Sequence, residues 1–191
     1  MQRRQYLATA AVIAGGTLAG CTTLTRATKL RLPTEEVEGN TVHLRYEEGD
    51  EEPLIVSHIV TQPTNSEFYR VRTVIQHSND TAVESFRFEF SDDRLVGNDI
   101  RLFVDPLRKG HFESASVRRD GDDIVVDVDD AGSSEGHPSF DLLCQPLVAP
   151  EELTHLRVDH EVELSESGVF SGSYSAKGYA LIELPELASG T

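Results

Sequence analysis

Cysteine and methionine are scarce in this sequence of 191 residues. It has two cysteines, Cys21 and Cys144, and its only methionine is the first residue. Once Cys21 is used as described below, a single thiol is left and no internal disulfide can form. A chain of this length does not need one, because a domain of its size can bury roughly 70% of the surface that the unfolded chain exposes.

Basic residues are also few, and this restricts the partners. The 33 acidic residues outnumber the 17 basic ones, the formal net charge is −16, and lysine occurs only at positions 29, 109 and 177. Such a surface repels phosphate, so nucleic acid is not an expected partner, and it opposes docking on an anionic membrane. Strong acidity with scarce lysine resembles the proteins of halophilic archaea, where molar salt shortens the Debye length to about 3 Å and lets carboxylates crowd. The alternative is an acidic face that binds cations or a basic partner.

Familiar catalytic and cofactor motifs are missing from the chain. The sequence contains neither a phosphate-binding P-loop nor a dinucleotide fingerprint. Its one match to G-x-S-x-G, at residues 132–136, is followed by a predicted strand rather than by the helix that the nucleophile elbow of hydrolases requires. It therefore gives no support for an enzyme, and we predict neither catalytic residues nor a cofactor.

The first 21 residues have the layout of a secretory signal peptide. Arg3 and Arg4 make the start positive, residues 6–20 are largely apolar and end in small residues, and no acidic residue precedes Glu35. The apolar stretch is shorter than the roughly 20 residues that a membrane-spanning helix needs. The arginine pair, with the three residues that follow it, resembles a twin-arginine signal, which implies export of the already folded protein.

The signal ends in a sequence that resembles a lipobox, where a lipoprotein precursor is cut and its new N-terminal cysteine is acylated. Leu18, Ala19 and Gly20 precede Cys21, and their small size lets a peptidase approach the backbone. The resemblance implies a lipoprotein that is anchored through Cys21 to the outer face of the cytoplasmic membrane, with an extracellular domain. Because one lipid chain binds a membrane only marginally, a second chain or an added contact is expected. The alternative is an N-terminal helix that is never removed.

Beyond the signal, the sequence predicts a polar tether at 22–38, in which Lys29–Leu32 could form a strand, and a single domain at 39–187. Within the domain, apolar and polar residues alternate with a period of two, as in strands that bury one face. No segment predicts a helix longer than two turns. Nine or ten short strands separated by turn residues predict an all-β fold, an antiparallel β-sandwich of immunoglobulin-like arrangement. A small closed β-barrel is the alternative.

The sequence also predicts one β-hairpin in detail. Asp120–Gly121 lies between two alternating runs, and glycine readily adopts the positive φ of a two-residue turn. A turn at these two residues would place Val117 opposite Ile124, with apolar pairs on one face and opposite charges on the other.

Cys144 raises the hypothesis of a blue-copper site. Such a site needs a thiolate, two imidazoles and usually an axial methionine, closely spaced on one loop. The next histidine, His155, is eleven residues away and no methionine follows the first residue, so the pattern fails. Phe140, Leu142 and Cys144 share one face of a strand, which predicts a buried and inert thiol.

The other titratable candidates have structural interpretations. His155 and His160 are five positions apart, so on a strand they point to opposite faces, and His160 continues an inward apolar face. His77 ends another apolar face beside a turn. The acidic residues between 120 and 130 do not match the spacing of a calcium loop, although the loop Asp129–Gly132 could bind a cation weakly. We predict no metal ligand.

These observations favour a non-enzymatic binding or assembly module that is held by lipid at the cell surface and contacts an unknown protein partner there. One alternative is a small secreted hydrolase whose site is assembled from distant residues. Another is a cation-binding surface protein.

Overall fold

The computed structural model describes residues 27–62, 68–92, 100–104, 115–121, 123–131, 137–146, 154–166 and 172–184, which form twelve strands. No helix in this part of the chain is long and apolar enough to span a membrane. The predicted leader, from Arg3 and Arg4 to Leu18, Ala19, Gly20 and Cys21, lies outside the described residues. The strands are β1 (Thr28–Lys29), β2 (Thr34–Glu38), β3 (Thr41–Glu48), β4 (Glu51–Thr61), β5 (Tyr69–His77), β6 (Thr81–Asp92), β7 (Ile100–Val104), β8 (Ala115–Asp120), β9 (Asp123–Val128), β10 (Ser139–Pro146), β11 (Thr154–Glu166) and β12 (Ser173–Leu184).

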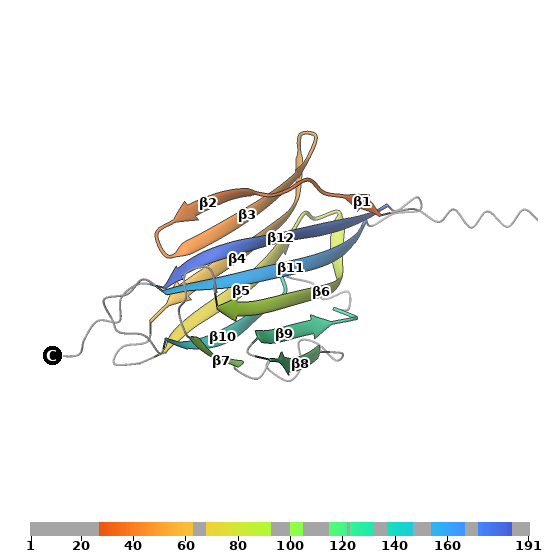
Figure 1. Cartoon of the computed structure of the whole chain (residues 1–191). Helices are drawn as coiled ribbons and strands as arrows, with labels where there is room; N and C mark the ends of the chain where they lie inside the picture. Colours follow the sequence, from red (N-terminus) through yellow and green to blue (C-terminus); the bar gives the residue numbers. More distant parts are fainter. Residues whose placement is uncertain are drawn as a thin grey trace, which may run out of the picture.

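The strands form two six-stranded sheets that pack face to face (Figure 1). Sheet A has the order β1-β12-β11-β6-β9-β8, and sheet B has the order β2-β3-β4-β5-β10-β7. Neighbouring strands are antiparallel, except that β1 runs parallel to β12. Within the described part of the chain each sheet keeps two edge strands, so the sheets do not close into a barrel. The predicted antiparallel β-sandwich is confirmed.

The central strands follow the immunoglobulin layout, in which A, B, E and D form one sheet and C, F and G the other. Strands β6 to β10 take the places of B to F in chain order, because β6-β9-β8 are neighbours in sheet A and β10-β7 in sheet B. The two flanking places are exchanged: β5, which precedes these strands, lies beside β10 in the place of G, and β11 lies beside β6 in the place of A. The immunoglobulin-like arrangement therefore holds for the central strands.

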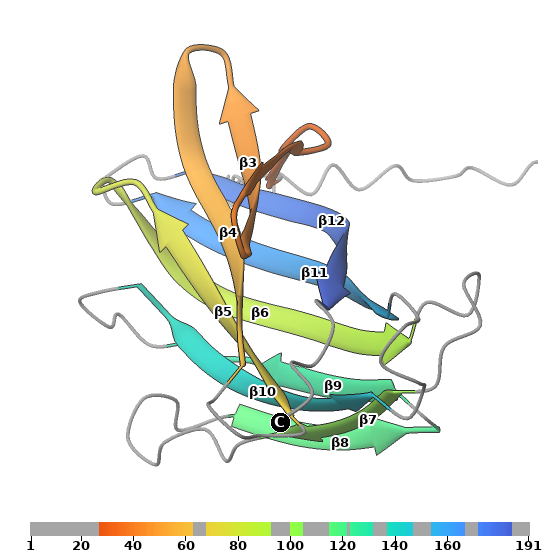
Figure 2. The ribbon, with the colours of Figure 1, turned by 90° about the vertical axis from the view of Figure 1, so that its left-hand side faces the viewer.

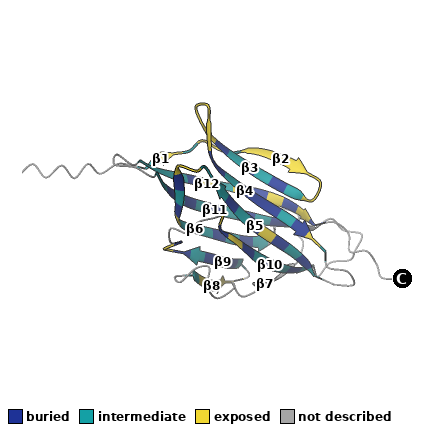
Figure 3. Ribbon diagram, turned by 180° about the vertical axis from the view of Figure 1, so that it is seen from behind, coloured by how far each residue is buried: buried dark blue, intermediate teal, exposed yellow. Residues whose placement is uncertain are grey.

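The alternation of apolar and polar residues produces the core between the sheets (Figure 3). Phe86, Phe88 and Phe90 of β6 point inward and are buried. Their rings lie on Phe140 of the opposite sheet, at centroid distances between 5.3 and 5.9 Å. Aromatic pairs at such distances contribute about 0.5–1.5 kcal/mol each beyond the area that they bury. The aromatic stripe visible in the sequence is thus the centre of the core.

The folded domain begins earlier than residue 39, which corrects the predicted tether at 22–38. β1 pairs with β12 at Thr28–Lys29, rather than extending over Lys29–Leu32, and β2 pairs with β3. Between them the chain crosses from sheet A to sheet B, and Figure 2 shows β2 beside β3 at the end of sheet B. All five residues of β2 are exposed. A glutamate-rich edge strand shows no apolar alternation, so its sequence gives no strand signal.

The β8–β9 hairpin forms as predicted, but its predicted register is wrong by two residues. Asp120 pairs with Asp123, and Val117 lies opposite Val126 instead of Ile124. Gly121 has a φ of 66°, in the left-handed region that glycine adopts readily, and it directly follows the last paired residue of β8. A shift of two residues leaves every side chain on its predicted face.

Candidate functional site

Charged side chains form two rows across the outer face of sheet A. The first row runs through cross-strand neighbours on β9, β6, β11 and β12: Asp127, Arg87, Glu161 and Lys177. The sign of the charge alternates along this row. Arg87 bonds Asp127 at 3.3 Å, and Lys177 bonds Glu161 at 2.6 Å. Opposite charges placed directly across strands stabilise a sheet modestly, by about 0.2–1 kcal/mol for each pair.

The second row lies two residues further along the strands and consists of Glu89, Asp159 and Tyr179. Its two acidic side chains are neighbours, and each is held by an arginine. Arg87 bonds Glu89 at 3.3 Å, and Arg157 donates two hydrogen bonds to Asp159, at 2.6 and 2.8 Å. The Arg157 guanidinium also lies 4.7 Å from the centre of the Tyr179 ring. Arg87 thus links the two rows, and Arg157 links Asp159 to Tyr179 within the second row.

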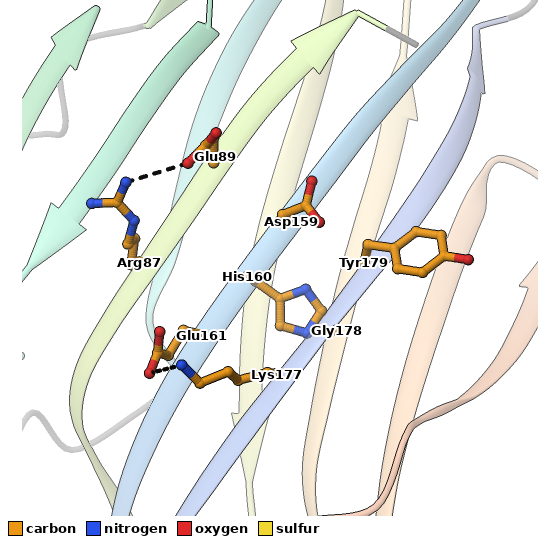
Figure 4. A pocket seen from close by; sticks show the side chains of 8 residues that line it. All are labelled: Arg87, Glu89, Asp159, His160, Glu161, Lys177, Gly178 and Tyr179. Atoms are coloured by element: carbon orange, nitrogen blue, oxygen red, sulfur yellow. Dashed lines mark hydrogen bonds and ion pairs between the residues drawn. The ribbon is translucent and has the colours of Figure 1, made fainter. Parts of the chain in front are cut away.

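A shallow groove of about 370 Å³ lies between the two rows (Figure 4). The rows form its walls. Its floor lies where His160 of β11 is opposite Gly178 of β12. The side chain of His160 is buried in the core, and a side chain at Gly178 would point into the core as well, so neither position places a side chain between the two rows.

Paired charges and the Tyr179 ring make up most of the lining of the groove. Its lining contains no serine, threonine or cysteine that could act as a nucleophile, and arginine or lysine bonds its three carboxylates. Within the described residues, no group of three or more histidine, cysteine or carboxylate side chains could hold a metal ion. Arginine and tyrosine, in contrast, are the residue types that most often provide binding energy at protein interfaces.

Beneath the floor of the groove, His160 belongs to a buried polar cluster. Its Nε2 lies 2.5 Å from the hydroxyl of Tyr46, which comes from β3 of the opposite sheet, and its ring stacks on Phe88 at 5.6 Å. Burial lowers the pKa of His160 to about 4 and raises the pKa of Tyr46 above its usual range. Both side chains are therefore neutral at pH 7, and their hydrogen bond joins the two sheets.

His58 of β4 is the second buried histidine of this cluster. Its Nδ1 lies 3.1 Å from the Thr73 hydroxyl, and its ring meets Phe88 edge to face. Burial, with a smaller effect of nearby His160, lowers the pKa of His58 to about 3. A histidine that is enclosed in the core and neutral across the physiological range is a structural group, not an acid–base catalyst.

A second depression, of about 520 Å³, has an acidic lining that includes Glu51, Glu52, Asp80 and Glu166. Tyr174 also lines it and donates a hydrogen bond to Glu166 at 2.5 Å. This bond lowers the pKa of Glu166 and is the main reason that the pKa of Tyr174 is raised to about 12. The pair fixes the end of β11 against the start of β12.

Cys144 and the histidines named from the sequence lie where the strand pattern predicts them, whereas the leader residues and Gly132 of the loop Asp129–Gly132 lie outside the described residues. Cys144 is buried in β10, and burial raises the pKa of its thiol well above the usual value, so the prediction of an inert thiol is confirmed. His160 is buried while His155 is half-buried on the other face of β11, which confirms their opposite orientation. His77 donates a hydrogen bond from Nδ1 to the carbonyl of Ser78 at 2.9 Å. None of these side chains lies beside another to form a site.

The sequence predictions did not include the groove, and they did not include Tyr46 and His58 of the buried cluster. Tyr46 and His58 continue the inward alternation of their strands, so the period-two pattern could have placed them in the core. The groove has no such local signal. Its side chains come from β6, β11 and β12, and they meet only through the register of a sheet whose strands are far apart in the sequence.

Comparison with known proteins gives one family and distant structural likenesses, two of which are described here. The sequence model of a family described as "Domain of unknown function (DUF8121)" matches residues 27–186. No curated protein matches the sequence. A collagen-binding domain from a Staphylococcus aureus adhesin is 8% identical with a TM-score of 0.36, and the match covers 64% of this chain and 95% of that one. The collagen adhesin CNA from S. aureus is 9% identical with a TM-score of 0.30, over 75% of this chain and 58% of that one. Likenesses this distant carry no argument about function.

Proposed function

The chain belongs to the family described as a domain of unknown function, DUF8121, and we propose that it is a non-enzymatic binding module held at the cell surface by lipid on Cys21. The module binds another protein through the outer face of sheet A. The observation that carries this proposal is the groove between the two charged rows. It presents Arg87 and Tyr179 on a face of sheet A that no other described strand covers.

The balance of charge on this face supports a protein partner. The two rows and Arg157 carry three basic and four acidic side chains, which are paired with one another, although the whole chain has a net charge of −16. A partner therefore meets less electrostatic repulsion here than on a surface of average composition. Complementary charges across an interface also fix register and suppress wrong partners more than they add affinity.

The proposed anchor would hold the domain close to the membrane. Cys21 would be the first residue of the mature chain, and β1 begins at Thr28. The six residues between them span at most about 20 Å when fully extended. The acidic surface is repelled by anionic headgroups, so a covalent lipid would be needed to keep the protein there.

The proposed export route can be tested in the source cells or in a salt-tolerant host. Replacing both arginines, by Arg3→Lys and Arg4→Lys, should leave the precursor inside the cell, because the twin-arginine pathway reads the pair. Fractionation followed by immunoblotting measures the result. Normal export of the double variant would mean that another route carries the protein.

Site-specific cross-linking tests the binding face. A photo-reactive residue in place of Glu89, in the wall of the groove, should capture a protein partner in native membranes. The same residue in place of Arg72, on the outer face of sheet B, is the control. Like Arg87, Arg72 bonds an acidic side chain, Asp141, at 2.8 and 3.1 Å.

The same cross-link then serves as the readout for single substitutions. Arg87→Ala should lower its yield about fivefold or more, as expected when an interface arginine that contributes over 1 kcal/mol is truncated. Arg72→Ala should leave the yield unchanged. Equal capture from both faces, or no effect of Arg87→Ala, would exclude the groove as the binding site.

A further inference from the structure

Most of one edge of β12 has no described strand beside it. β1 pairs with β12 only at Thr28–Tyr174 and Lys29–Ser175, with one further bond from the N–H of Leu30 to the carbonyl of Ser175 at 3.0 Å. The chain then leaves sheet A to become β2. From Lys177 to Leu184, the described strands pair with β12 only on its β11 side (Figure 1).

The unpaired backbone groups belong to alternate residues. The carbonyl of Ser175 points toward β1, and hydrogen-bonding direction alternates along a strand. Lys177, Tyr179, Leu181 and Glu183 therefore direct both N–H and C=O to the open edge. The side chains of the same four residues lie on the outer face, since those of Ala176, Ala180, Ile182 and Leu184 are buried.

Exposed apolar side chains gather along this side of the sandwich. Tyr179 is 54% and Leu181 40% exposed on β12 itself. Leu32, at 87%, and Val37, at 62%, belong to the segment that leaves β1 and becomes the edge of sheet B. Among the described residues these are four of the five large apolar side chains that are exposed, the fifth being Val117. Unpaired edges with apolar neighbours mark sites of strand addition, because proteins otherwise protect such edges with charge or bulges.

We propose that this edge of β12 pairs with the same edge of a second copy of the chain, antiparallel and about a two-fold axis at Ala180. The sequence of the edge is complementary to itself in this register. Lys177 of each copy lies opposite Glu183 of the other, and Tyr179 lies opposite Leu181. All four are residues whose backbone groups face the edge, so the ladder of hydrogen bonds continues from one sheet A into the next.

Other registers lose this complementarity. A slip of two residues places Lys177 opposite Leu181 or moves it past the end of β12, and either change leaves both charges unpaired. A slip of one residue puts apolar core side chains opposite outward-facing ones. A parallel pairing in register would put lysine beside lysine. Only the register centred on Ala180 matches charge with opposite charge and apolar with apolar.

The side chains that the two paired strands direct toward the cores are also compatible with this register. The residues on the inner face next to the axis are Gly178 and Ala180, which are small, and each Gly178 would lie opposite Ile182 of the second copy. The segment with Leu32 and Val37 flanks the same edge, so the approach of a second copy removes apolar surface from water on both strands. This interface shares Lys177 and Tyr179 with the lining of the groove, so dimer formation would alter the surface that the groove offers to a partner.

Charge exchange tests the proposal directly. The full mature chain in density-matched detergent should sediment as a dimer. Lys177→Glu alone and Glu183→Lys alone should each weaken the dimer by about tenfold or more, because two attractive cross-strand pairs become repulsive. The double variant, with both substitutions, should dimerise like the unaltered chain. An equimolar mixture of the two single variants should form heterodimers, since all facing charges are then opposite.

A further substitution tests the apolar pairs of the interface, which salt does not screen. Leu181→Lys removes both Tyr179–Leu181 pairs and should abolish the dimer at any ionic strength, while an unchanged thermal unfolding midpoint shows that the fold is intact. A chain that remains monomeric, with a Kd weaker than about 1 mM, would overturn the proposal. So would a dimer that none of these substitutions weakens, because another surface would then form it. Failure of the mixed single variants to associate would overturn the register.

Discussion

Acid should destabilise this protein well before its carboxylates are protonated, because two neutral histidines are enclosed in the core. His58 and His160 each use one ring nitrogen, with Thr73 and Tyr46 as partners, while the other nitrogen has no hydrogen-bond partner among the described residues. Burial lowers the pKa values of His58 to about 3 and of His160 to about 4. In the unfolded chain both should titrate near 6.5.

Proton linkage gives both the sign and the size of this effect of pH on the free energy of unfolding. Between pH 6.5 and 4 the unfolded chain binds a proton on each ring and the native protein does not, so falling pH favours unfolding. The stability is fully present above pH 6.5 and is lost as the pH falls toward the folded pKa values. Each histidine should lower the free energy of unfolding by about 2 kcal/mol between pH 7 and pH 5, which gives about 4 kcal/mol for both. That is a large part of the 5–15 kcal/mol typical of a domain.

Denaturant unfolding at pH 7, 6 and 5, in a constant high concentration of salt, measures this loss. His160→Gln keeps a hydrogen-bonding side chain opposite Tyr46 but cannot titrate, so it should remove about 2 kcal/mol of the pH-dependent loss. It should do so even if the variant is less stable at pH 7. His137→Gln alters an exposed histidine and should keep the full loss. A free energy of unfolding that is the same at pH 7 and pH 5 would refute the reasoning.

Three further predictions concern single positions. Gly178→Ala should destabilise the domain by about 1–3 kcal/mol, because the added methyl group would meet the Tyr46 hydroxyl; Tyr46→Phe in the same chain should recover part of the loss in a double-mutant cycle. Cys144 should resist maleimide at pH 8 and react fully once the protein is unfolded, since only an exposed thiolate reacts; rapid labelling of the native protein would show that the thiol is accessible. Cys21→Ser should release the protein from the membrane fraction or leave it unprocessed, and mass spectrometry of the native protein should find lipid on Cys21; a trimmed variant that stays on the membrane would count against the anchor.

The fold could be predicted where one strand's own sequence determines its orientation. Phe86, Phe88 and Phe90 point inward because a period of two puts them on one face, and the same rule placed Cys144 and His160 in the core. β2 could not be predicted in this way. Both faces of that edge strand are exposed to solvent, so its sequence shows no alternation of apolar and polar residues.

Pairing between strands could be predicted only in part. The turn at Gly121 identified the β8–β9 hairpin, but glycine can take either central place of a two-residue turn, and this ambiguity allowed a register that was wrong by two. The groove depends on Arg87, Asp159 and Lys177 meeting across three strands. Their meeting is fixed by the packing of the whole sheet, including the irregularity between Glu163 and Leu164, and no local pattern encodes it.

β1 also determines how the domain would respond to a mechanical load. A lipid at Cys21 would transmit tension through residues 22–27 to β1, which is held to sheet A by two paired residues, whereas β2 is held to β3 by five. Under tension β1 should therefore detach from sheet A first. The released residues 28–33 would then lengthen the segment between the lipid and the folded domain by up to about 20 Å. The sandwich would yield by a short, reversible extension at its attachment point while its core remains folded.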